Sequence, residues 1–108
     1  EDELHLPNNT KLQFIKKIGG GLSLSKLGVK SLKVKSRTGG EKLKPFSDQP
    51  SRSLKYLFQN ADIPLWERDQ IPLIFAKKQL IAVPNLGIHY EYQSSEGELG
   101  YEINWLRE

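Results

Sequence analysis

The side chains most able to do chemistry are cations, and three of them alternate along one short segment. Lys33, Lys35 and Arg37 occupy every second position, interleaved with the apolar residues Leu32 and Val34. Successive side chains of a β-strand point to opposite faces, so a strand here would place the three cations in one row. Such a row can neutralise the phosphates of a polyanion. The pattern therefore predicts a cationic strand face.

Further cations follow along the chain. Lys42 and Lys44 lie in a predicted loop, and Arg52 and Lys55 share one face of a predicted helix. In a second predicted helix Trp66 could add a planar contact to a base, although core packing is the favoured interpretation of this indole. We expect the cations to converge, and the predicted polyanion-binding residues are Lys33, Lys35, Arg37, Lys42, Lys44, Arg52, Lys55 and Arg68.

Charge is distributed unevenly along the chain. Residues 11–55 carry ten lysines and two arginines against two acidic residues, whereas residues 56–108 carry four cations against eight acidic residues. The net charge of the whole chain is only +3. A basic half joined to an acidic half attracts a polyanion to one face. An ordinary solvated surface explains these charges equally well.

No set of residues predicts catalysis. The two histidines, His5 and His89, lie far apart without a partner motif, and there is no cysteine, which argues against a catalytic or metal site. Residues 19–21 are glycines that lack the ending of a phosphate-binding P-loop, so a turn is favoured. A plain turn or a close approach to a phosphate fits Gly39-Gly40 equally well. We predict no catalytic residue, metal or cofactor in this chain itself.

Alternation and apolar runs predict a strand-rich domain. The expected strands cover residues 12–18, 22–25, 29–37, 73–76, 80–83, 87–92 and 101–106. The runs 73–76 and 80–83 are apolar without alternation, so we expect a hairpin that is buried on both faces. The last two strands should pair with each other across residues 94–100.

Two helices are expected between these strand groups. One covers residues 51–60 and is capped by Ser51 or Ser53, and a shorter one covers residues 65–70. The long connection over residues 38–50 is expected to be functional or mobile. The predicted class is α+β, a small β-rich domain with about two short helices.

The start of the chain suggests that it is part of a longer protein, because it has no initiator methionine. Residues 1–10 are acidic and turn-forming, and we expect them to be a tether from a preceding part, with the binding domain over residues 11–108. No segment resembles a signal peptide. No apolar run approaches the ~18 residues of a membrane span. We therefore predict a cytoplasmic protein without membrane contact.

Four segments in order resemble one family. Residues 33–43 resemble the Arg-x-Gly-Gly-Glu segment of bacterial tRNA(Ile)-lysidine synthetase. Residues 51–58, 63–73 and 81–87 are similar to the C-terminal domain of that family in the same order and spacing. The resemblance covers roughly residues 29–106.

This resemblance implies a role in tRNA modification. The family is a ligase that uses ATP, with magnesium, to join lysine to the wobble cytidine of an isoleucine tRNA. Its C-terminal domain would help to hold the tRNA, at the acceptor stem, beside the catalytic N-terminal domain of the same protein. The family's catalytic Ser-Gly-Gly-x-Asp-Ser loop is absent here, so the resemblance carries over RNA binding and not catalysis.

Two other interpretations remain open at this stage. The domain could dock on the rest of its own protein through the hairpin strands, without touching RNA. It could also be an independent enzyme, which the missing site chemistry disfavours. Salt-dependent binding to tRNA separates the first alternative from the RNA-binding hypothesis.

Overall fold

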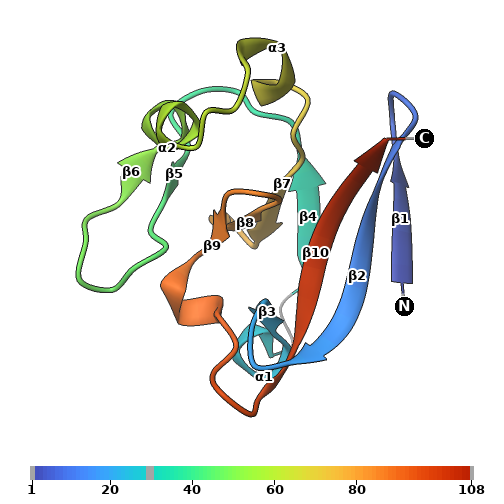
Figure 1. The fold of residues 1–108 in the computed structure, drawn as a ribbon, viewed down its shortest axis with the longest axis vertical. Coiled ribbons are helices and arrows are strands. Elements are labelled where there is room, and N and C mark those ends of the chain that lie inside the picture. Colours follow the sequence, from blue (N-terminus) through green and yellow to red (C-terminus); the bar gives the residue numbers. More distant parts are fainter. Residues whose placement is uncertain (1, 29–30, 108) are drawn as a thin grey trace.

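The computed structural model of the chain describes residues 2–28 and 31–107, and it opens on a β-hairpin (Figure 1). Strand β1 (Asp2–Leu6) pairs antiparallel with β2 (Thr10–Ile18). The turn between them has Asn8 at φ 68° and Asn9 at φ 58°. Two positive φ values suit the right-handed twist of a tight hairpin, and asparagine tolerates them. The segment expected to be a tether therefore contains a strand of the sheet.

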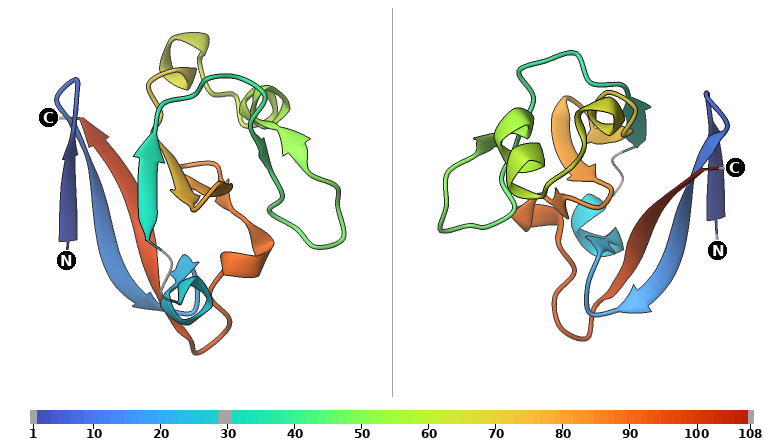
Figure 2. Two further views of the ribbon diagram at one scale, coloured as in Figure 1. Left: turned by 180° about the vertical axis from the view of Figure 1, so that it is seen from behind. Right: turned by 45° about the horizontal axis from the view of Figure 1, so that its top comes forward.

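Strand β10 (Leu99–Arg107) has the same length as β2 and lies antiparallel along it in the first sheet. The register runs from Leu99 opposite Ile18 to Arg107 opposite Thr10. The short strand β3 (Leu22–Ser23) pairs with the other edge of β10, which gives the order β1-β2-β10-β3. Figures 1 and 2 show β1, β2 and β10 as one curved layer on one side of the molecule.

The predicted pairing of residues 87–92 with 101–106 is wrong. Strand β9 (Gly87–Ile88) pairs with β8 (Gln79–Val83) instead, and residues Tyr90–Tyr92 form the 3₁₀ turn η1. Alternation identifies a half-buried strand but carries no information about its partner. Here the partner of β10 is the distant strand β2.

The second sheet has the order β4-β7-β8-β9. Strand β4 (Leu32–Lys35) shows the predicted alternation, with exposed lysines between half-buried apolar residues. Its bounds are shorter than expected, and residues 29 and 30 lie outside the described part of the chain. The hairpin of β7 (Leu73–Ala76) and β8 is confirmed, with Lys77 at φ 55° in its turn.

Serine caps set the start of two helices. Ser53 accepts a hydrogen bond from the Tyr56 amide and begins α2 (Leu54–Asn60), three residues later than predicted. Ser23 accepts from the Lys26 amide and turns the end of the expected strand 22–25 into α1 (Leu24–Leu27). Residues 52–53 form β6 (Arg52–Ser53) rather than helix.

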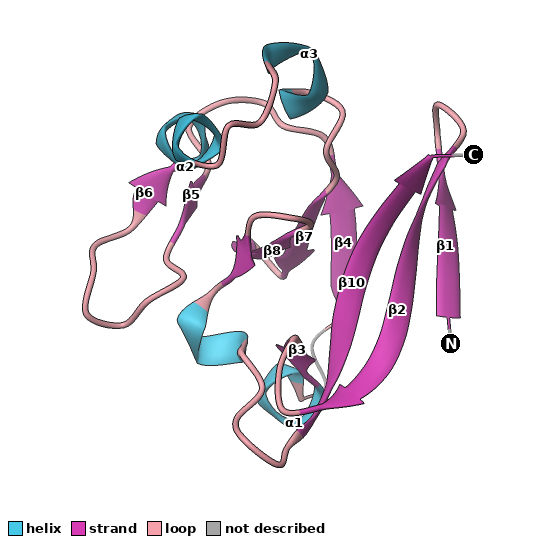
Figure 3. Cartoon of the chain, viewed as in Figure 1, coloured by secondary structure: helices cyan, strands magenta, loops and turns pink. Residues whose placement is uncertain are grey.

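The expected long loop over residues 38–50 is pinned at its centre. Strand β5 (Lys42–Leu43) pairs with β6, and the Leu43 side chain is buried. A one-turn helix, α3 (Leu65–Arg68), follows α2 as predicted but is shorter. Figure 3 shows α2 and α3 together at one end of the molecule, above the second sheet.

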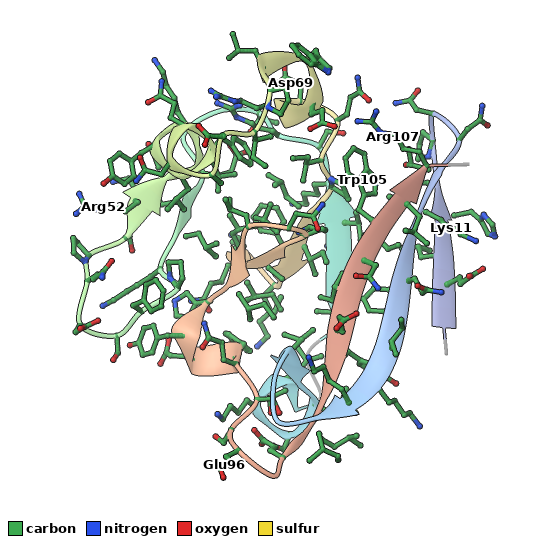
Figure 4. All side chains as sticks on the ribbon, in the orientation of Figure 1. Lys11, Arg52, Asp69, Glu96, Trp105 and Arg107 are labelled. Atoms are coloured by element: carbon green, nitrogen blue, oxygen red, sulfur yellow. The ribbon has the colours of Figure 1, made fainter. Side chains whose placement is uncertain are left out.

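The core has two apolar clusters that meet at one side chain. One cluster packs the two sheets together around Leu12, Leu22 and Ile81, and the other packs α2 against the second sheet around Leu54 and Phe58. Trp105 packs against both clusters, and in Figure 4 it lies between β10 and the rest of the fold. The strand-rich α+β class is confirmed. No helix in the described part of the chain could cross a membrane.

Candidate nucleic-acid interface

A carboxylate closes the turn that follows the cationic strand. Glu41 accepts hydrogen bonds from the Thr38 amide (2.8 Å), the Thr38 hydroxyl (2.8 Å) and the Gly39 amide (2.9 Å). Partial burial raises the pKa of Glu41, but these hydrogen bonds outweigh it and the pKa lies below its ordinary value. The Gly39 amide is thus engaged within the turn, which favours the plain-turn interpretation of Gly39-Gly40.

Three predicted cations from three different elements line an open hollow on one side of this turn. Arg37 follows β4, Lys55 lies on α2 and Arg68 ends α3. We call this the first hollow, and its full lining is Arg37, Thr38, Gly39, Lys55, Leu65, Arg68 and Asp69. Three cations and a single carboxylate give it a positive charge, so it is suited to a phosphate.

Contacts with the core fix the arginines of the first hollow. The Arg37 guanidinium carbon lies 5.3 Å from the centre of the Phe58 ring, and a guanidinium nitrogen lies 3.7 Å from a carboxylate oxygen of Asp69. Arg68 donates from Nε to the carbonyl oxygen of Ile63 at 2.9 Å. Both arginines are therefore held in place and leave further N–H donors for a ligand.

A second cationic hollow lies on the other side of the same turn. Lys35 and Lys42, both predicted, line it together with Lys78 of the β7–β8 hairpin. The Lys35 ammonium lies 5.2 Å from the centre of the Phe75 ring. We call this the second hollow, and its full lining is Lys35, Ser36, Thr38, Gly39, Gly40, Glu41, Lys42, Phe75, Lys78 and Leu80. Lys78 was not among the predicted residues, although two adjacent lysines in a predicted hairpin turn indicate exposed charge.

The two hollows share Thr38 and Gly39, so their cations form one continuous surface. We call it the cationic track, and its cations are Lys35, Arg37, Lys42, Lys55, Arg68 and Lys78. Five of these six were predicted from sequence. They come from β4 and the segment after it, from β5, from α2 and α3, and from the β7–β8 turn, so only the folded chain assembles them.

The remaining three predicted residues do not line these hollows. Lys33 is exposed on β4, and the Lys44 ammonium lies 5.1 Å from the centre of the Tyr90 ring. The Arg52 guanidinium lies 5.0 Å from the centre of the Tyr56 ring, and Figure 4 shows Arg52 on the outer side of β6, far from Asp69. Arg52 thus lies apart from the surface that it was expected to share with Arg37 and Lys55. Neither Arg52 nor Lys55 pairs with an acid in the described chain.

The helix α3 presents its apolar side chains to solvent. Leu65 is 73% exposed and Trp66 is 74% exposed, so the favoured core-packing interpretation of Trp66 is wrong. The other side of α3 is tied to β10, because Arg107 donates to Glu67 at 3.0 Å. Periodicity could not distinguish these faces, since the helix has a single turn.

His89 makes several contacts within the fold. It is buried, its Nδ1 accepts from the Glu91 amide at 3.1 Å, and its ring stacks on Tyr90. Burial lowers the pKa of His89, the carboxylate of Glu91 raises it, and the ammonium of Lys44 lowers it, with a net lowering. Within the described ranges, no three His, Cys, Asp or Glu side chains gather closely enough to hold a metal ion.

Known proteins share this sequence and fold. The family model described as the TilS substrate C-terminal domain matches residues 32–105. A protein named tRNA(Ile)-lysidine synthase from Nitrosomonas europaea is 35% identical over 94 residues, which are 87% of this chain and 20% of that protein. Another of the same name from Shewanella woodyi is 30% identical over 105 residues, which are 94% of this chain and 22% of that protein.

A solved structure described as the crystal structure of the TILS C-terminal domain has the same fold. It matches with a TM-score of 0.73 at 21% identity and covers 98% of this chain and 90% of that one. The chain spans about a fifth of the length of the curated relatives it matches. Because the family model covers most of the chain, the resemblance seen in the sequence is confirmed: the chain belongs to the TilS substrate C-terminal domain family.

Proposed function

We propose that this domain holds tRNA for a tRNA(Ile)-lysidine synthase, and that the cationic track contacts backbone phosphates of the acceptor stem. The observation that carries the proposal is the convergence of six cations from separate elements on both sides of the Glu41 turn. A-form RNA hides its base edges in a deep and narrow groove, so recognition goes through shape and phosphates. A surface of spaced cations is suited to that task.

Catalysis is proposed to lie outside this domain. In this proposal a preceding catalytic part of the longer protein, in the cytoplasm, binds ATP and magnesium and joins lysine to the tRNA. The glycines of residues 19–21 do not fit a phosphate loop. Gly21 packs so closely against β10 that a Cβ atom on it would stand 2.1 Å from the Tyr101 carbonyl oxygen. This glycine serves backbone packing.

The test is the salt dependence of tRNA binding by the 108-residue chain. Fluorescence anisotropy with labelled tRNA between about 50 and 200 mM salt should give a log–log slope of several units, near −0.9 for each phosphate contacted in a duplex. A slope near zero would contradict the proposal. Affinity of the domain alone should be weak, because contacts made elsewhere in the protein are missing.

A matched pair of variants locates the interface. Lys35→Gln with Lys42→Gln removes two exposed charges from the cationic track. Lys16→Gln with Lys17→Gln removes two exposed charges from β2, outside the track. The first pair should reduce the slope by about two and the second should change it little. Equal effects would mean that net charge alone governs binding.

A docking role without RNA contact is the second candidate. The β7–β8 hairpin offers little free edge for it, since β4 pairs along the whole of β7 and β9 pairs with the end of β8 at Ala82 and Val83. An apolar hollow beside α2 favours this candidate instead, because Phe46 on its rim is 57% exposed and Leu57 and Leu86 line it. Loss of catalysis in Phe46→Ser full-length enzyme, with normal tRNA affinity, would support docking.

A further inference from the structure

We propose that Trp66 is a stacking platform for an unpaired nucleotide whose phosphate lies in the first hollow. This inference rests on the proposed RNA-binding function and adds the class of RNA feature that the domain recognises. Leu65 and Trp66 are the two most exposed of the large apolar side chains in the described ranges, at 73% and 74%. Leu65 also lines the first hollow, so an apolar surface adjoins the cations directly.

The platform is held rigidly although α3 has only one turn. A helix of this length is not stable by itself. Hydrogen bonds with residues on either side of α3 in the chain, and with β10, hold it in place instead. Arg68 donates to the Ile63 carbonyl (2.9 Å), the Gln70 side chain donates to the Trp66 carbonyl (3.1 Å), and Arg107 reaches from β10 to Glu67 (3.0 Å). The fold thus fixes the backbone of Trp66 while leaving its indole in water.

A nucleotide is the ligand that uses both halves of this surface. Its base has an apolar face that stacks on an indole, and its phosphate pairs with arginine and lysine. Bases inside a duplex are already stacked on one another, so the base must come from a single-stranded end or loop. An acidic peptide would satisfy the cations, but the cationic track continues past the Glu41 turn into the second hollow, as an extended phosphate backbone requires.

The experiment compares two RNAs on the 108-residue chain: a short blunt-ended hairpin, and the same hairpin with an unpaired 3′ extension of a few nucleotides. One stacked base should raise the affinity for the extended RNA by about 5- to 150-fold. Trp66→Ala should abolish this gain and leave the affinity for the blunt hairpin within about twofold, because the phosphate contacts remain. Trp66→Phe, which keeps an aromatic face, should retain most of the gain.

Fluorescence gives a second readout. The chain has two tryptophans, so Trp105→Phe leaves Trp66 as the sole indole. Its emission should be quenched by the extended RNA and much less by the blunt hairpin.

Two results would overturn the stacking role: Trp66→Ala still binds the extended RNA more tightly than the blunt hairpin by the full factor, or the extended RNA does not quench Trp66. In either case the blunt-hairpin affinities still report on the phosphate contacts. Failure of both RNAs to bind overturns the proposed function and this inference together, and equal quenching by a polyglutamate peptide assigns the surface to a protein segment instead.

Discussion

The Arg37 guanidinium lies over the ring of Phe58, with 5.3 Å between its central carbon and the ring centre. Phe58 is fully buried in the cluster that packs α2 onto the second sheet. A cation that follows β4 is therefore positioned by an aromatic side chain of α2. This contact joins the apolar core to the first hollow and makes the position of the charge depend on the fold.

Arg37→Gln should weaken tRNA binding several-fold and reduce the salt slope by about one, because one phosphate contact is lost. The matched control is Arg52→Gln, which removes the same charge from the outer side of β6. Its affinity and slope should stay close to those of the unmodified chain. Anisotropy titrations at several salt concentrations measure both quantities. A larger loss for Arg52→Gln than for Arg37→Gln would contradict the assignment of the cationic track.

Glu41→Gln should destabilise the Glu41 turn, since one amide oxygen cannot replace a carboxylate that accepts three hydrogen bonds. We expect a loss of about 1 kcal/mol in the free energy of unfolding at neutral pH. The pKa of Glu41 is lowered in the folded chain, so its carboxylate stabilises fully above the ordinary value of 4.5. That contribution is lost as the pH falls through the lowered pKa.

Urea unfolding at neutral and acidic pH tests this sign. The stability difference between the unmodified chain and Glu41→Gln should shrink in acid. Asp48→Asn removes an equal charge from an exposed position in the same connection and should change stability by less than about 0.5 kcal/mol at either pH. If the stability difference between the unmodified chain and Glu41→Gln widened in acid, the hydrogen bonds of the Glu41 carboxylate would not be its cause.

Trp105→Ala should lower the free energy of unfolding by about 3 kcal/mol, because this side chain packs against both apolar clusters. Trp105→Phe should be much milder. Within the described residues, the indole N–H of Trp105 is the buried side-chain polar atom without a hydrogen-bond partner, so its removal sacrifices no bond. Trp66→Ala removes an exposed side chain and should change the free energy of unfolding by less than about 0.5 kcal/mol. Thermal unfolding by circular dichroism ranks the three variants.

Gly21→Ala should prevent or severely weaken folding of the first sheet. Its φ is 75°, and a Cβ atom would meet the Tyr101 carbonyl oxygen at 2.1 Å, so the backbone must move. Gly28→Ala is the control, since Gly28 has a similar φ of 63° but open space around it. With φ at 63° and ψ at −132°, Gly28 has a backbone conformation that favours glycine, so we expect the control to lose about 1–3 kcal/mol in the free energy of unfolding, from backbone strain alone. Similar losses in both variants would mean that strain, and not the approach to β10, dominates.

Local patterns in the sequence predicted most of the elements. The apolar runs 73–76 and 80–83 indicated the buried hairpin, and the serine before Leu54 indicated the cap of α2. The alternation of Lys33 and Lys35 with apolar residues indicated an outward cationic face of β4. These signals are readable because hydrogen bonding and side-chain direction within one element depend on residues close in the chain.

The boundaries and exposures of small elements were less readable. A one-turn helix has too few residues to show which face is apolar, so the sequence carries no signal that Trp66 is exposed, and the general preference of tryptophan for the core is misleading here. The acidic character of residues 1–10 likewise concealed a strand, because an edge strand exposes most of its side chains and can be polar. In both cases the neighbouring element, and not the local composition, decides burial.

The sequence by itself determined the α+β class, the family and the supply of cations between residues 11 and 55. The tertiary structure decided that β10 pairs with β2, and it brought Arg37, Lys55 and Arg68 into one hollow while leaving Arg52 outside. The physical reason is that strand partners and converging side chains depend on contacts between residues distant in the chain. Such contacts are selected by the packing of the whole core, here around Phe58 and Trp105, which no local pattern contains.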